Sequence, residues 1–184
     1  MLMWKQLRPV QRGDALLLAM FSVLLAWVVL APFTLPPGSV TDLSGRTITI
    51  DNMDQISKMN PFAAAIYYLG DSQCHQLASR SYFLNGNQMP FCSRDVGIFL
   101  GLVVGMAIAL FTRIRLRWYM VILGFAPMAI DGGLQALTSY ESSNPLRLAT
   151  GLLAGISVAL LLHIFSTWYL GKLDAVRGSR GHGS

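Results

Sequence analysis

The sequence predicts an all-α integral membrane protein with four transmembrane helices, a short interfacial or re-entrant helix and a small extracytoplasmic cap. Of the 184 residues, 53% are hydrophobic and only 12% are charged, and the mean hydropathy of +0.49 exceeds that of ordinary soluble domains. Four apolar stretches are long enough to cross a hydrocarbon core of roughly 30 Å. Basic residues lie between these stretches, where they orient a membrane protein.

We expect one membrane domain over residues 1–177, followed by a small, polar and flexible tail over 178–184. The spans are predicted at about residues 15–33, 96–111, 118–137 and 147–170, with an extracytoplasmic loop over 34–95. The first apolar run is longer than the core of a signal peptide and lacks a small-residue cleavage pattern. We therefore interpret it as an uncleaved helix.

The charge distribution argues for a membrane orientation and against a nucleic-acid partner. The formal net charge is +5, but the positive charges flank the spans instead of forming a patch. With both termini in the cytoplasm and the chain in the plasma membrane, the short connections obey the positive-inside rule. The basic residues then placed inside are Lys5, Arg8, Arg12, Arg113, Arg115, Arg117, Lys172, Arg177 and Arg180.

The long loop contains three local signals. Residues 46–51 alternate between polar and apolar side chains, which predicts a short strand. Asn60 is expected to cap a helix that begins at Pro61, and the apolar run over 62–69 is too short to span the membrane. Asn85-Gly86 is a turn signal, so the following segment is expected to fold back.

The later spans carry a small-residue face and a polar end. Gly97, Gly101 and Gly105 recur every four residues, so they share one helix face that lets another helix approach closely. That helix can belong to this chain, to another membrane subunit or to a second copy. Asp131 and Gln135, one turn apart, lie at the end of the third span on the predicted outer side.

Both cysteines of the chain lie in the loop before the second span. Cys74, His75 and Cys92 are plausible ligands of a soft metal such as zinc or copper, and Asp95, Asp131 or Glu141 could complete the set, although the spacing matches no standard zinc motif. The alternative is a Cys74 to Cys92 disulfide, which an oxidising compartment favours and which would contribute about 3 kcal/mol. Two free thiols are the third possibility.

Arginines and amides on the same predicted side suggest a ligand site. The arginines can neutralise nearby carboxylates, or they can clamp a phosphate or carboxylate group. The candidate ligand-binding residues are Gln76, Arg80, Gln88, Arg94, Gln135, Asn144 and Arg147. The candidate acid–base residues are His75, Asp131 and Glu141.

A set of motifs between about residues 70 and 155 resembles a known family. The motifs are Cys74-His75-Gln76, Cys92-Ser93-Arg94, Asp131-Gly132 with Gln135, and Glu141-Ser142 with Asn144 and Arg147. They are similar to those of an uncharacterised family of small integral membrane proteins in bacteria and archaea. The resemblance implies a membrane protein of unknown function. Many members carry a further cysteine where this chain has Asp95, which leaves Cys74 and Cys92 as a single pair.

Three functions remain open from the sequence. The first is a membrane-embedded protein that binds, and possibly acts on, the polar or anionic head group of a lipid or quinone in an outer-face pocket. The second is a non-catalytic accessory subunit of a larger membrane complex with a disulfide-stapled loop. The third is a small transporter, which the apolar middles of all four spans disfavour.

Overall fold

The computed structural model describes residues 9–46, 48–112 and 117–181, and for Pro9, Trp118 and 171–181 it describes the backbone alone. Within this part, four helices are long and apolar enough to cross a membrane. They are α2 (Pro9–Leu30), α5 (Ser93–Phe111), α6 (Trp118–Leu137) and α7 (Asn144–Gly181). The predicted fold class, a four-span membrane protein with a cap, is confirmed.

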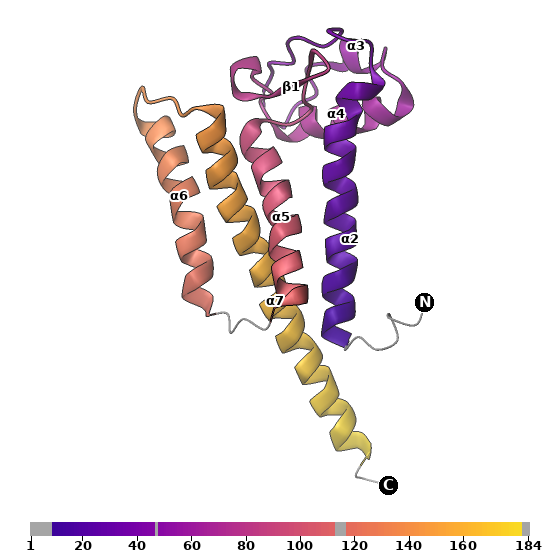
Figure 1. The fold of residues 1–184 in the computed structure, drawn as a ribbon, viewed down its shortest axis with the longest axis vertical. Coiled ribbons are helices and arrows are strands. Elements are labelled where there is room, and N and C mark those ends of the chain that lie inside the picture. Colours follow the sequence, from indigo (N-terminus) through magenta and orange to yellow (C-terminus); the bar gives the residue numbers. More distant parts are fainter. Residues whose placement is uncertain (1–8, 47, 113–116, 182–184) are drawn as a thin grey trace.

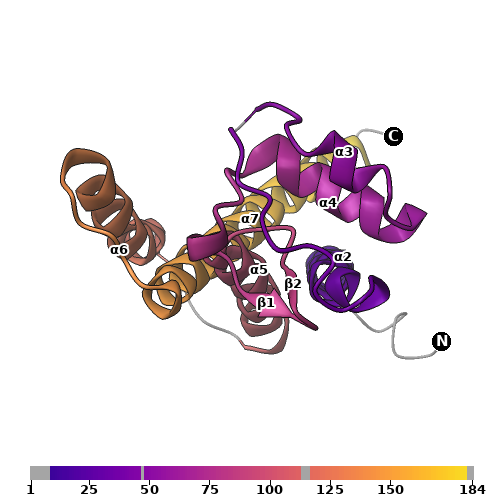
Figure 2. The same cartoon turned by 90° about the horizontal axis from the view of Figure 1, so that it is seen from above.

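The four helices lie side by side in the order α6, α7, α5 and α2, and the cap covers one end of them (Figure 1). Seen from the cap side, α7 runs under the cap between α6 and α2 (Figure 2). The start of α2 and the end of α7 both lie at the opposite end (Figure 1). Lys5, Arg8, Arg113, Arg115 and His182 fall outside the described residues.

Helices α2, α5 and α7 begin earlier than the predicted spans, and α7 ends later. The first span starts at Pro9 and continues into a 3-10 turn, η1 (Ala31–Thr34). α5 begins at Ser93, because its first turn consists of polar residues that a hydropathy pattern does not assign to a span. α7 runs on to Gly181, so the backbone shows no break between the predicted span and the first residues of the predicted tail.

Glycine brings α5 and α7 into backbone contact. A Cβ atom on Gly97 would lie 2.3 Å from the carbonyl oxygen of Leu148, and one on Gly101 would lie 2.2 Å from that of Leu152. On the facing helix, a Cβ on Gly155 would lie 2.2 Å from the Ile98 carbonyl oxygen. These distances are far below van der Waals contact, so only glycine fits. The glycine faces are therefore covered within the chain and are not free to dock another subunit.

The cap contains α3 (Met53–Ile56), α4 (Pro61–Gln73), the 3-10 turn η2 (Ala78–Arg80) and a hairpin of β1 (Phe83–Leu84) and β2 (Asn87–Gln88). The Asn60 side chain caps α4 by accepting a hydrogen bond from the Ala63 amide at 3.0 Å, as expected. The hairpin turns at Asn85-Gly86, where both residues have positive φ, again as expected.

The expected strand over 46–51 is wrong. The described residues of this segment form no strand. Instead, the Asp51 carboxylate accepts hydrogen bonds from the Arg46 amide at 2.7 Å and the Thr49 hydroxyl at 3.2 Å. The Asp51 carboxylate thus accepts the hydrogen bond of a backbone amide that a neighbouring strand would otherwise bind.

Buried amides fasten the cap to the helices. Asn87 accepts a hydrogen bond from the Val40 amide and donates to the Pro32 carbonyl at the end of the first span. Asn52 donates to the buried Asp71 carboxylate at 2.6 Å. Because these side chains are buried and fully engaged, they hold an otherwise irregular loop in one shape.

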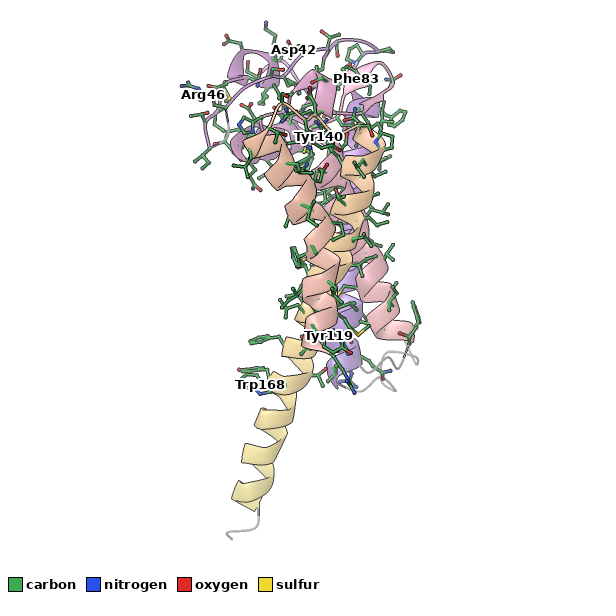
Figure 3. All side chains as sticks on the ribbon, turned by 90° about the vertical axis from the view of Figure 1, so that its left-hand side faces the viewer. Asp42, Arg46, Phe83, Tyr119, Tyr140 and Trp168 are labelled. Carbon is green, nitrogen blue, oxygen red and sulfur yellow. The ribbon has the colours of Figure 1, made fainter. Side chains whose placement is uncertain are left out.

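Aromatic side chains mark the two ends of the bundle. Tyr140 lies near the cap, whereas Tyr119 and Trp168 lie at the opposite end (Figure 3). All three are exposed, with 41%, 43% and 55% of their surface accessible. Tyr and Trp favour the two membrane–water interfaces, so these positions agree with a membrane across the four helices.

We expect Gly101→Ala to lower the free energy of unfolding by about 1–3 kcal/mol, because the new methyl group would displace the Leu152 backbone. The matched control is Gly133→Ala on α6, where a Cβ would meet no atom within 4 Å. The control should be neutral or slightly stabilising, since alanine favours helix. Thermal unfolding in detergent measures both; equal unfolding temperatures would contradict the close packing.

Candidate functional site

A small cavity of about 110 Å³ lies where the cap meets the ends of α5, α6 and α7. Segments far apart in the sequence contribute to it: the cysteine stretch after α4, the start of α5, the end of α6 and the start of α7. The sequence predicted that these segments share the outer face. The lining residues are Cys74, His75, Gln76, Leu77, Arg80, Cys92, Arg94, Gln135 and Arg147.

The lining contains three guanidinium groups and no carboxylate. Arg80 and Arg94 are partly exposed, at 39% and 25% of their side-chain surface, whereas the Arg147 side chain is 3% exposed. Guanidinium forks are suited to phosphate and carboxylate groups. The cavity is therefore a cationic space with an opening towards solvent.

The counter-charges lie behind the arginines, outside the cavity lining. Asp131, only 5% exposed, accepts a hydrogen bond from Arg94 Nη2 at 2.5 Å. Glu141 lies 3.1 Å from Arg80 Nε and 3.4 Å from Arg147 Nη2, so it joins two arginines. These contacts aim the guanidinium groups and reduce their mutual repulsion.

Several buried polar atoms at the site have no hydrogen-bond partner among the described residues: Gln76 Oε1, Arg94 Nε and Asp131 Oδ1. Gln76 and Arg94 line the cavity. The other end of the Gln76 amide donates to the Pro90 carbonyl at 2.6 Å, which fixes its orientation. An unpaired buried polar atom is unfavourable, so the Gln76 and Arg94 side chains retain unused hydrogen-bonding capacity beside the cavity.

The backbone at Gln76 is strained. Its φ is 44°, in the left-handed region that residues other than glycine rarely adopt. The residue is also almost completely buried, at 1% exposed. The carbonyl oxygen of Gln76 accepts a 2.5 Å hydrogen bond from Gln88 Nε2. Such strain persists only where surrounding contacts fix it, and it is common at functional sites.

The two cysteines lie together at one wall of the cavity. Cys92 Sγ donates to Asp95 Oδ2 at 3.0 Å, and the ligand atoms of Cys74, Cys92 and Asp95 all lie within 4.8 Å of one another. The neighbouring Cys92 thiol lowers the pKa of the Cys74 thiol. The same contact, burial and the nearby Asp95 carboxylate raise the pKa of the Cys92 thiol.

The predicted site residues fall into three groups. His75, Gln76, Arg80, Arg94, Gln135 and Arg147 line the cavity together with both cysteines. Asp131, Glu141 and Asn144 lie behind it and hold arginines; Asn144 Oδ1 accepts from Arg147 Nη1 at 3.3 Å. Gln88 is fully buried elsewhere, where its amide binds the Leu43 amide and the Gln76 carbonyl.

Of the three carboxylates that the sequence offered to complete a metal site, Asp95 is the one that lies beside the two cysteines, and His75 is not in this three-residue group. Sequence reasoning missed one association. At the opposite end of the bundle, the buried Asp14 lies 2.9 Å from His163 Nδ1. No pattern in the sequence links Asp14 on α2 with His163 on α7.

The fold and site therefore define a four-span membrane protein whose cap encloses a cationic, thiol-containing cavity. Residues 74–161 match the family described as "Predicted membrane protein (DUF2085)". This region begins at Cys74 and includes every residue that lines the cavity. The chain belongs to this family.

Two archaeal relatives each match about half of the chain. An uncharacterised protein of Methanocaldococcus jannaschii is 41% identical over 99 residues, which are 50% of this chain and 63% of that protein. An uncharacterised protein of Methanothermobacter thermautotrophicus is 35% identical over 94 residues, 50% of this chain and 85% of its own length. This chain thus matches less than two thirds of the M. jannaschii protein. No solved structure matches.

Acid should remove the contribution of Glu141. Its hydrogen bond and attraction to Arg80 hold its pKa below the usual value of 4.5. The stabilisation is therefore fully present above that value and is lost as the pH falls through the lower folded pKa. We expect wild type to unfold at a higher temperature than Glu141→Gln at neutral pH, with the difference disappearing once the pH falls below the folded pKa of Glu141.

Thermal unfolding of both proteins in detergent across this range is the measurement. The control is Asp54→Asn, since Asp54 is exposed and forms no ion pair in the described part of the chain. A difference between wild type and Glu141→Gln that stays constant down to the lowest pH would contradict the ion-pair account.

Proposed function

We propose that the cavity binds the anionic or polar head group of an amphipathic ligand of the lipid or quinone type. The observation that carries this proposal is the composition of the wall: three arginines line it, and the carboxylates that balance them lie outside the lining. A cation-lined, partly dehydrated space attracts a negatively charged or carbonyl-bearing group.

The size and position of the cavity support a head group joined to an apolar tail. About 110 Å³ accommodates a small polar group but not a whole lipid. Gln135 lines the cavity near the end of α6, where Leu134 and Leu137 are 47% and 86% exposed. A tail attached to the bound group could therefore lie along the apolar outer face of α6.

Each lining residue has a role in this proposal. Arg80, Arg94 and Arg147 bind the charge, and the Gln76 and Gln135 amides add neutral hydrogen bonds. His75 is exposed and is the imidazole that lines the cavity, so it is the candidate acid–base group if the ligand is acted upon. Asp131 and Glu141 position the arginines.

The proposed orientation places the cap outside the plasma membrane and both termini in the cytoplasm. Arg12 and Arg117 lie near the end of the bundle opposite the cap, in the regions where α2 and α6 begin. Basic residues favour the cytoplasmic end of short connections. The cavity would then open to the extracytoplasmic leaflet.

Binding of short-chain lipids to the protein in detergent tests the proposal. We expect dioctanoyl phosphatidylglycerol to bind, and Arg80→Gln to weaken that binding about tenfold, the loss of one charge-assisted hydrogen bond of about 1.5 kcal/mol. Arg46→Gln is the matched control, because Arg46 lies in the cap, pairs with Asp51 and does not line the cavity. Titration calorimetry measures both.

Further ligands separate the sources of the bound group. Dioctanoyl phosphatidylcholine tests whether net negative charge is needed, inorganic phosphate tests a free anion, and a short-chain quinone tests carbonyl recognition. Absence of binding by the phosphatidylglycerol and the quinone, or equal weakening by Arg80→Gln and Arg46→Gln, would contradict the proposal.

A further inference from the structure

Cys74, Cys92 and Asp95 form a compact group of ligand-type side chains at one wall of the cavity. The sulfur and carboxylate atoms that they offer all lie within 4.8 Å of one another. Two thiolates and a carboxylate around a tetrahedral zinc ion lie about 3.5 Å apart, given metal–ligand bonds of about 2.0–2.3 Å. We propose that these three residues bind one thiophilic metal ion of the zinc class.

The backbone holds the three ligands close together without a metal. Cys74 immediately follows α4, and its amide donates to the Gly70 carbonyl at 2.9 Å, while Cys92 is the residue immediately before α5. Asp95 lies three residues later in the first turn of α5, where its carboxylate accepts a hydrogen bond from the Cys92 thiol. The group therefore lies where the end of α4 meets the start of α5. The positive end of the α5 helix dipole stabilises the negative charge of thiolate and carboxylate side chains there.

The junction is clamped by close contacts around it. A Cβ on Gly70 would lie 1.9 Å from the Pro90 carbonyl oxygen, so α4 and the segment before Cys92 approach as closely as a glycine allows. The Gln76 amide donates to the same carbonyl at 2.6 Å. These contacts restrain the two cysteine-bearing segments relative to each other, and such preorganisation favours metal binding.

Charge compensation also points to a cation. Among the described residues, Asp95 forms no ion pair, and its hydrogen-bond partner is the Cys92 thiol. The neighbouring Arg94 pairs with Asp131. A bound divalent ion would give the Asp95 carboxylate the cationic partner that it lacks among the described ion pairs.

The ligand count predicts an open metal site. Cys74 and Cys92 both line the cavity, so the fourth position of a tetrahedral ion would face it. Three protein ligands with one open position are typical of zinc sites that bind water or a substrate. An oxygen of a bound head group could then reach the metal. This consequence rests on the proposed function, whereas metal binding itself does not rest on it.

The metal stoichiometry of the full chain tests this assignment. Protein purified in detergent without chelator or reductant should contain one zinc ion per chain by mass spectrometry. Replacement by Co²⁺ should produce thiolate-to-cobalt charge-transfer absorption. Cys74→Ser and Asp95→Asn should each weaken Co²⁺ binding by at least about tenfold, whereas Asp54→Asn, an exposed carboxylate elsewhere in the cap, should leave it unchanged.

Three results would overturn the metal site. The first is a Cys74 to Cys92 disulfide in the purified protein, seen as two unreactive cysteines that reductant releases. The second is reduced protein that shows no thiolate-to-cobalt absorption. The third is Co²⁺ binding that survives Asp95→Asn unweakened while the variant unfolds at the wild-type temperature, since Asp95 would then not be a ligand.

Metal binding and head-group binding can fail separately. Arg80→Gln should lose affinity for dioctanoyl phosphatidylglycerol and keep its metal, because Arg80 lines the cavity but is not in the ligand group. A protein that holds zinc but binds no lipid would retain the metal site and refute only the head-group proposal. A protein that binds the lipid but holds no metal would retain the head-group proposal and refute only the metal site.

Discussion

The close packing of α5 on α7 is the constraint on which the rest of the structure depends. Glycines on both helices bring the two backbones together, and at the cap end a Cβ on Gly151 would lie 2.2 Å from the Arg94 carbonyl oxygen. This contact places the first turn of α5 beside the second turn of α7, with Arg94 on one helix and Arg147 on the other. The close packing therefore fixes the relative positions of two of the arginines that line the cavity.

The charged side chains at this end of the helices form two layers around the cavity. The guanidinium groups line the cavity, while Asp131 on α6 and Glu141 in the following loop bind them from behind. Desolvating three cations is unfavourable, and the carboxylates offset this without occupying the cavity. Cys74 and Cys92 line the same cavity, just after the end of α4 and just before the start of α5. One small space thus combines cationic, amide and sulfur chemistry.

The sequence predicted the features that depend on local patterns. Hydropathy located four spans, Asn60-Pro61 located the start of α4, and Asn85-Gly86 located the hairpin turn, because each signal acts within a few residues. It failed at residues 46–51, where the Asp51 carboxylate outcompetes strand pairing. It also could not separate Gln88, which fastens the cap, from Gln76, which lines the cavity, since both are buried amides and only their tertiary partners differ.

An experimental structure of the protein in a lipid nanodisc with dioctanoyl phosphatidylglycerol tests the central claim most directly. The account predicts head-group density in contact with Arg80, Arg94 and Arg147, with the acyl chains along the exposed face of α6. Lipid density confined to the outer surfaces of the helices, with the arginines bound only to Asp131 and Glu141 and the cavity closed, would contradict it.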